Sequence, residues 1–247
     1  MAWFKQLSAL LSTSKMTELQ AVIFDFDGTI CDSEWPIYEA SAAALGEMGL
    51  DLSVAGWATV VGLGHDDSFA ALERAVGATI DREEFESRYE SMDRSWVDEL
   101  EALPGALELI RELAQEEIAV GVASSSSKRW VEGHLGRLGV LDLISVVATR
   151  DSVEGRTKPD PASYRFALQS LGVGADQAMA IEDSAPGISA ALGADLKVFA
   201  IPSRITRFTD LSAASVEVQS LADLDVANLR AFLARFPSDS GRILWEC

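Results

Sequence analysis

Cysteine is scarce in this chain of 247 residues, which has two, Cys31 and Cys247. A secreted domain that depends on disulfides needs a denser set, so the sequence does not indicate that class, although one bridge between the two is left open. The opening stretch 1–15 lacks the long apolar core and small-residue cleavage site of a signal peptide. We therefore expect a cytoplasmic protein.

Long apolar runs and positive charge are also in short supply. No run approaches the roughly 18–20 apolar residues that cross a bilayer. The chain has 39 acidic against 20 basic residues, a formal charge of −19. Such a charge repels nucleic acid and anionic membrane surfaces, so neither is expected as a partner. A negative protein that handles phosphate needs local cations at its site, which favours a bound metal.

The chain does contain short buried-looking segments that alternate with amphipathic ones. The apolar runs predict strands at 21–24, 118–123, 143–148, 178–181 and 196–201. Helical patterns follow at 104–117, 128–138, 161–171 and 185–192. Strand alternating with helix predicts an α/β fold, a doubly wound parallel sheet with helices on both faces.

One long segment interrupts this alternation. Residues 34–100 carry helical patterns, such as 37–48 and 82–100, and no convincing strand. We interpret them as a small α-helical cap domain inserted into a Rossmann-like core of residues 20–33 and 101–235. Residues 1–19 are then an N-terminal extension and 236–247 a C-terminal tail. The alternative is that the inserted helices pack on the sheet.

The first chemically informative motif is Asp25-Phe26-Asp27-Gly28-Thr29, at the end of the first predicted strand. Residues two apart in an extended chain point to the same side, so the carboxylates of Asp25 and Asp27 are expected to be directed together. A cation between them would relieve their repulsion, and Gly28 permits a sharp turn. Two acids with one metal suit phosphoryl transfer. The alternative is a common surface Asp-Gly turn.

Two further motifs offer groups that bind phosphate. Ser124 follows the second predicted strand, where hydroxyl and backbone N–H groups can cradle a phosphate, with Ser125 as a second donor. Lys158 precedes Pro159, where it can neutralise both a phosphate and a carboxylate. Asp160 is interpreted as a helix N-cap. Taken alone, the serines are also typical of a plain polar loop.

The last motif is Glu182-Asp183, which ends the fourth predicted strand. Mg²⁺ prefers oxygen ligands and commonly takes one or two carboxylates together with phosphate and water. Asp183 is the preferred ligand, with Glu182 in support, and Gly187 is expected to let the next helix pack closely. An isolated acidic pair at a helix start can also simply compensate the helix dipole.

In this order the motifs resemble those of the haloacid dehalogenase-like hydrolase superfamily, specifically the phosphoglucomutase-like branch with a cap after the first motif. The resemblance implies that Asp25 is the nucleophile that forms an aspartyl-phosphate and that Asp27 is the general acid and base. It implies that Ser124 and Lys158 hold the phosphoryl oxygens, with Gly28 and Thr29 in the same binding loop. Mg²⁺ would be held by Asp25, the main-chain carbonyl of Asp27 and Asp183.

The same resemblance orders the alternative functions. Dehalogenases of the superfamily lack the second aspartate, which is present here as Asp27, and no lysine between Lys15 and Lys128 could serve a phosphonatase. The loop 61–68 resembles that of sugar-phosphate mutases, but His65 and Ile37 stand where β-phosphoglucomutases carry arginine and histidine. Phosphatase is therefore favoured over mutase, and a catalytically silent phosphate-binding protein remains as a third alternative.

The cap is expected to contact the leaving group. Its candidate specificity residues are Trp35, His65, Arg74 and Arg94. A helical lid leaves little room for a protein substrate, so the expected partner is a small phosphorylated metabolite such as a sugar phosphate. We expect a monomer or weak dimer.

Overall fold

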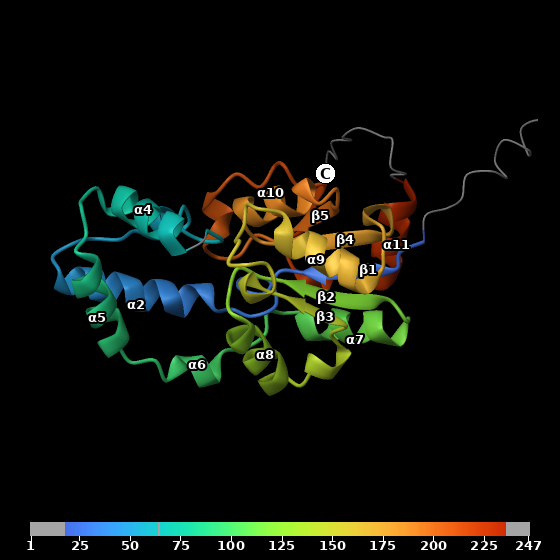
Figure 1. Cartoon of the computed structure of the whole chain (residues 1–247), viewed down its shortest axis with the longest axis horizontal. Helices are drawn as coiled ribbons and strands as arrows, with labels where there is room; N and C mark the ends of the chain where they lie inside the picture. The colour runs from blue at the N-terminus through green and yellow to red at the C-terminus, as the bar shows by residue number, and fades with distance from the viewer. Residues whose placement is uncertain (1–17, 64, 236–247) are drawn as a thin grey trace, which may run out of the picture.

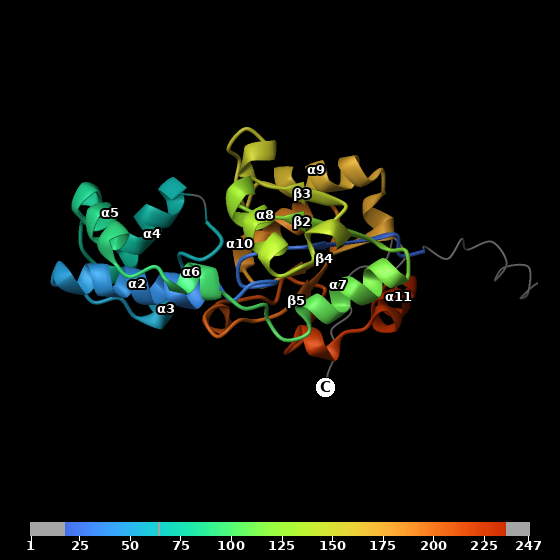
Figure 2. The same cartoon turned by 90° about the horizontal axis from the view of Figure 1, so that it is seen from below.

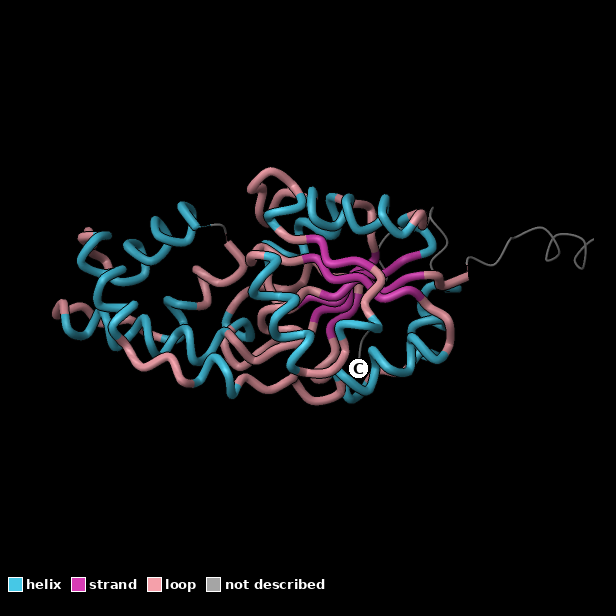
Figure 3. Tube along the Cα trace, turned by 60° about the horizontal axis from the view of Figure 1, so that its bottom comes forward, coloured by secondary structure: helices cyan, strands magenta, loops and turns pink. Residues whose placement is uncertain are grey.

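The computed structural model of the protein describes residues 18–63 and 65–235, without the side chains of residues 65, 66 and 235. The predicted tail 236–247 and nearly all of the predicted extension 1–19 lie outside these ranges. Within them, six parallel strands form one sheet in the order β3-β2-β1-β4-β5-β6 (Figures 1 and 3). The strands are β1 (Ala21–Phe24), β2 (Ala119–Ala123), β3 (Val146–Ala148), β4 (Ala178–Glu182), β5 (Lys197–Ala200) and β6 (Val216–Glu217).

Both faces of the sheet are covered, which is why its strands are apolar on both sides. Along β1, Val22 and Phe24 face one hydrophobic cluster, whereas Ala21 and Ile23 face the other. The first cluster is completed by α7 (Ala106–Gln115), α8 (Lys128–Arg137) and α11 (Val226–Arg235). The second is completed by α9 (Ala162–Leu171) and α10 (Ala185–Gly193). The predicted doubly wound α/β fold is confirmed.

Strand β1 lies at the point where the winding of the sheet changes direction. It pairs with β2 on one side and with β4 on the other. In such sheets the crevice for a ligand lies outside the carboxyl ends of the strands, at this switch point. The fold therefore places the residues that follow β1, β2 and β4 around one crevice.

The inserted segment forms a group of helices beyond that edge of the sheet (Figures 1 and 2). These helices are α2 (Glu34–Glu47), α3 (Val54–Trp57), α4 (His65–Val76), α5 (Arg82–Ser91) and α6 (Trp96–Glu99). Leu45, Trp57 and Leu72 belong to a separate apolar cluster, which also takes in Ile205 from the loop after β5. The two linkers run side by side, since the amide of Asp32 donates to the carbonyl of Glu101 at 3.1 Å. The domain boundaries themselves stay a prediction.

Several element bounds differ from the predicted ones for local reasons. The strand predicted at 143–148 shortens to β3, because Leu143 belongs to a 3-10 helix. The helix predicted at 82–100 is two helices, α5 and α6. Helix α7 begins at Ala106 and not at Pro104, because Gly105 adopts φ +86° next to the backbone of residue 222. Among the described residues, no helix is long and apolar enough to cross a membrane.

Candidate active site

The carboxyl ends of the central strands bring the predicted site residues together. Asp25, Asp27, Ser124, Ser125, Lys158 and Asp183 all line one cavity of about 510 Å³. Other parts of its wall come from the inserted segment, from α8 and from the loops of the core, including Glu34, Ile37, Leu63, Tyr89, Arg94, Trp96, Trp130, Arg150 and Ser184. Four stretches that are distant in sequence therefore converge on one cavity.

Lys158 forms a buried ion-pair bridge between two carboxylates. Its Nζ donates to Asp25 Oδ1 and, at 2.6 Å, to Glu182 Oε1. Burial alone lowers the pKa of Lys158, but Asp25 and Glu182 outweigh it and raise that pKa above its ordinary value. Burial raises the pKa of Asp25 to about 7, although Lys158 acts in the opposite direction. Lys158 is thus held as a cation against Asp25.

Glu182 is fully buried and positions this lysine. Its Oε1 accepts hydrogen bonds from Lys158 and from the Tyr164 hydroxyl at 2.7 Å. Its Oε2 accepts from the amides of Asp183 and Ser184 at 3.2 and 3.3 Å. The predicted close approach at Gly187 is confirmed, since a Cβ built there would lie 2.0 Å from both carboxylate oxygens of Glu182.

A cluster of three buried acids offers ligands for a divalent cation. Asp25, Glu182 and Asp183 each present a carboxylate oxygen within 4.8 Å of the others. Burial, then Asp25 and Glu182, raise the pKa of Asp183 well above its ordinary value, a repulsion that a cation would relieve. Both oxygens of Glu182 accept hydrogen bonds, whereas Asp25 and Asp183 each keep one carboxylate oxygen to which no described residue donates, so these two are the better placed ligands. The donor set, all carboxylate oxygen, fits Mg²⁺.

The turn after β1 is shaped around Asp183. Gly28 adopts φ +83°, and a Cβ built there would lie 2.4 Å from Asp183 Oδ2. The hydroxyl of Thr206 donates to the same oxygen at 3.3 Å. A side chain at position 28 would therefore strain the backbone and also displace an acid of the cluster.

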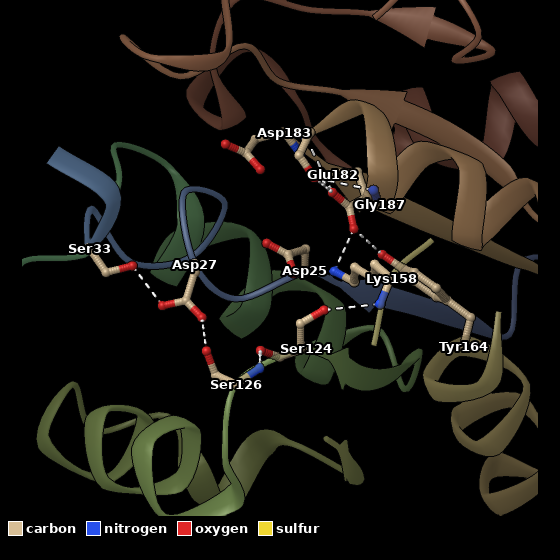
Figure 4. A network of polar contacts seen from close by, with 12 residues as sticks. Asp25, Asp27, Ser33, Ser124, Ser126, Lys158, Tyr164, Glu182, Asp183 and Gly187 are labelled. Carbon is tan, nitrogen blue, oxygen red and sulfur yellow. Dashed lines mark hydrogen bonds and ion pairs between the residues drawn. The ribbon is translucent and has the colours of Figure 1, made fainter. Parts of the chain in front are cut away.

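Asp27 lines the same cavity as Asp25, but it has different partners. Its Oδ1 accepts hydrogen bonds from the Ser33 hydroxyl at 2.7 Å and from the Trp130 indole N–H at 2.9 Å. Its Oδ2 accepts from the Ser126 hydroxyl at 2.6 Å. Figure 4 shows Asp27 with the two serines on one side of Asp25, and Lys158 on the other side. The two acids are thus held by separate networks.

Of the remaining predicted residues, some line the cavity and others do not. The hydroxyl of Ser124 accepts from the amide of Ser126 at 2.9 Å, and that of Ser125 accepts from the amide of Lys158 at 3.2 Å. Thr29 is fully buried with no partner for its hydroxyl, and neither it nor Gly28 lines the cavity. His65 begins α4, but its side chain lies outside the described part of the chain.

Sequence reasoning missed several side chains of the site. Ser33, Ser126 and Trp130 hold Asp27, and Tyr164 holds Glu182. A polar aromatic residue early in the helix that follows each motif is the one signal that points to Trp130 and Tyr164. Glu34 was also missed as a cavity residue; burial, then Asp27 and Asp25, raise its pKa to about 8.

Comparisons with known proteins agree with this geometry. The family model described as haloacid dehalogenase-like hydrolase matches residues 22–201. The Bacillus subtilis protein YhcW is 32% identical over 212 residues, which are 85% of this chain and 96% of YhcW. A phosphoglycolate phosphatase of Rhodospirillum rubrum is 31% identical, over 90% of this chain and 93% of its own. CbbY of Rhodobacter sphaeroides, solved with phosphate, is 26% identical, with a TM-score of 0.68 over 85% of this chain and 99% of CbbY.

Proposed function

The chain belongs to the haloacid dehalogenase-like hydrolase family, and from that premise we propose that it is a Mg²⁺-dependent phosphatase acting on a small phosphate monoester through an aspartyl-phosphate on Asp25. Its enzyme class, phosphoric monoester hydrolase, is that of its relatives. The observation that carries the proposal is the convergence of Asp25, Ser124, Lys158 and Asp183 on one cavity.

Asp25 is the proposed nucleophile. The Nζ of Lys158 donates to Oδ1 of Asp25, and among the described residues no donor contacts Oδ2 of Asp25. We assign to Oδ2 the attack on phosphorus, which forms the Asp25–phosphate bond as the bond to the leaving oxygen breaks. Lys158 stabilises the charge on the phosphoryl oxygens. Ser124 and Ser125 line the same cavity as Lys158 and are proposed to help hold these oxygens.

Asp27 is the proposed proton carrier. It gives a proton to the departing alcohol oxygen in the first step. In the second step it takes a proton from water, whose oxygen attacks phosphorus and releases Asp25. The donors Ser33, Ser126 and Trp130 position its carboxyl group in the cavity wall for this purpose.

Asp25 and Asp183, with the main-chain carbonyl of Asp27, are the residues that would hold Mg²⁺, and Glu182 supports them through Lys158. A bound divalent ion supplies positive charge that offsets the repulsion between an anionic nucleophile and an anionic ester. The size of the cavity, about 510 Å³, suits a small metabolite rather than a protein, as does its cover of helices.

The test is a panel of about a hundred phosphate monoesters, with β-glucose 1-phosphate isomerisation measured alongside. We expect phosphate release in Mg²⁺, its loss in EDTA, and turnover lowered by more than about a thousandfold in a folded Asp25→Asn variant. Isomerisation in place of release would support the mutase alternative. Absence of metal-dependent release from every ester, or near-normal turnover by Asp25→Asn, would reject the proposal.

A further inference from the structure

The cavity carries two arginines that the proposed phosphoryl chemistry does not use. Arg94 lies in the linker between α5 and α6, and Arg150 begins a 3-10 helix (Arg150–Ser152) after β3. Both line the cavity that contains Asp25 and Lys158. We propose that they bind a second anionic group of the substrate, so that the preferred substrates are phosphate monoesters that also carry a carboxylate or a second phosphate. This inference rests on the proposed phosphatase function.

The ion pairs in the cavity support a second anion-binding position, separate from the phosphoryl site at Lys158. The charge of Lys158 is already balanced by Asp25 and Glu182. Within the described ranges, no carboxylate lies within ion-pair distance of Arg94. The nearest acid to Arg150 is Asp151 at 3.9 Å, and that carboxylate accepts the amide of Lys128 at 2.7 Å. Both guanidinium groups therefore keep donors for a ligand.

Their location distinguishes these two arginines from others. Arg82 and Arg88 of the same group of helices form ion pairs with glutamates at 2.8–2.9 Å. Arg74 also has no acidic partner among the described residues, but it does not line the cavity. Arg94 has no acidic partner among the described residues and Arg150 only one at 3.9 Å, yet both line a ligand cavity in a chain of charge −19. An anionic ligand explains this placement better than stability does.

Arg94 is also restrained in a way that suits recognition. Its Cζ lies 5.5 Å from the centroid of the Tyr89 ring, and Tyr89 lines the same cavity. Stacking limits the rotamers of the side chain, so less entropy is lost when its planar fork meets a carboxylate or phosphate. Two N–H groups can then donate in parallel to two oxygens of the ligand.

Matched pairs of esters test the inference. 3-Phosphoglycerate and glycerol 3-phosphate differ by a carboxylate in place of a hydroxymethyl group, and fructose 1,6-bisphosphate and fructose 6-phosphate differ by one phosphate. We expect the wild-type enzyme with Mg²⁺ to favour the anionic member of at least one pair by roughly tenfold in kcat/KM. The pair that responds identifies the second anion as carboxylate or phosphate.

Arginine variants then locate the recognition. Arg94→Ala and Arg150→Ala should each reduce that preference, chiefly through KM of the anionic member, and Arg94→Lys should restore part of it. Arg74→Ala removes the same charge from the inserted helices away from the cavity and should leave the preference unchanged. Equal kcat/KM within both pairs in the wild type, or a preference kept by both cavity variants, would overturn the inference while leaving the phosphatase proposal intact. Release from no ester at all would instead reject the phosphatase proposal, and this inference with it.

Discussion

Gly187 shows how a residue without a side chain can control a catalytic group. It approaches Glu182 so closely that any Cβ would occupy the position of the carboxylate. Glu182 in turn holds Lys158, and Lys158 holds Asp25. A single methyl group at position 187 therefore acts on the proposed nucleophile through two side chains, those of Glu182 and Lys158.

Gly187→Ala is expected to lower kcat/KM by roughly a hundredfold or more and to destabilise the protein by about 2–3 kcal/mol, because a buried ion pair loses its geometry. Steady-state kinetics and urea unfolding would measure both. Gly133→Ala is the matched control: it is also helical, in α8, and its Cβ meets nothing within 4 Å. Equal behaviour of the two variants would contradict the structure.

The titration of Asp25 gives a second prediction at this scale. Burial raises its pKa to about 7 from an ordinary 3.8, so between these values the folded chain keeps a proton that the unfolded chain loses. The contribution of Asp25 to stability therefore falls as pH rises from about 4 to about 7. The amide side chain that Asp25→Asn introduces does not titrate in this pH range, so it makes no such pH-dependent contribution.

In EDTA, the free energy of unfolding of Asp25→Asn relative to wild type should increase over that pH window and then level off. Denaturant unfolding at several pH values measures it. A difference that is constant from pH 4 to 8 would show that the acid titrates normally in the folded protein.

At the scale of elements, the loop between α3 and α4 rests on the amino end of α10. Gly62, in this loop, adopts φ +80°, and a Cβ built there would lie 2.7 Å from the Ser184 hydroxyl. Ser184 is the N-cap of α10 and follows Asp183 directly. This contact, with the Cζ of Arg204 4.1 Å from the ring centroid of Trp35 in α2, connects the inserted helices to the sheet region.

Gly62→Ala should lift this loop and lower kcat/KM by roughly tenfold or more, in addition to about 1–2 kcal/mol of backbone strain. Gly77→Ala separates the two effects, because Gly77 has φ +69° and open space around it. It should show the strain in thermal unfolding with normal kinetics. Normal kinetics in Gly62→Ala as well would show that this contact does not matter for turnover.

For the whole molecule, the important feature is the concentration of buried acid at one edge of the sheet. Asp25, Glu182 and Asp183 are all buried there, and among them Lys158 is the partner that offsets their charge. Burying like charges destabilises the folded chain, so a cation that binds only the folded state should stabilise it through mass action.

Mg²⁺ at about a hundred times its dissociation constant should add about 2.7 kcal/mol to the free energy of unfolding, or roughly 5–10 °C in Tm. Differential scanning fluorimetry with increasing Mg²⁺ measures this. Asp183→Asn should fold, as judged by circular dichroism, but lose most of the response. A wild-type Tm that is independent of Mg²⁺ would count against a metal site at these acids.

The features that the sequence determined are those that depend on neighbouring residues. Apolar runs predicted the strands that became β1, β2, β4 and β5, and turn residues such as Gly28 predicted where the chain changes direction. Once parallel strands are expected, their carboxyl ends must share an edge. The convergence of Asp25, Ser124 and Asp183 followed from this local information, whereas Lys158 does not follow a strand directly and its place at the site was not fixed by the strand pattern.

Only the tertiary structure decided which side chains hold the site residues in place. Ser126 and Trp130 meet Asp27 from 99 and 103 positions away, and no periodicity encodes such a contact. The spacing of Asp25 and Asp27 predicted that both carboxylates are directed together, but separate networks hold them. This difference also comes from the packing of whole elements. The local sequence pattern indicates which residues are buried and where the chain turns. The partner of a side chain depends instead on how whole elements pack, because packing brings together residues that are far apart along the chain.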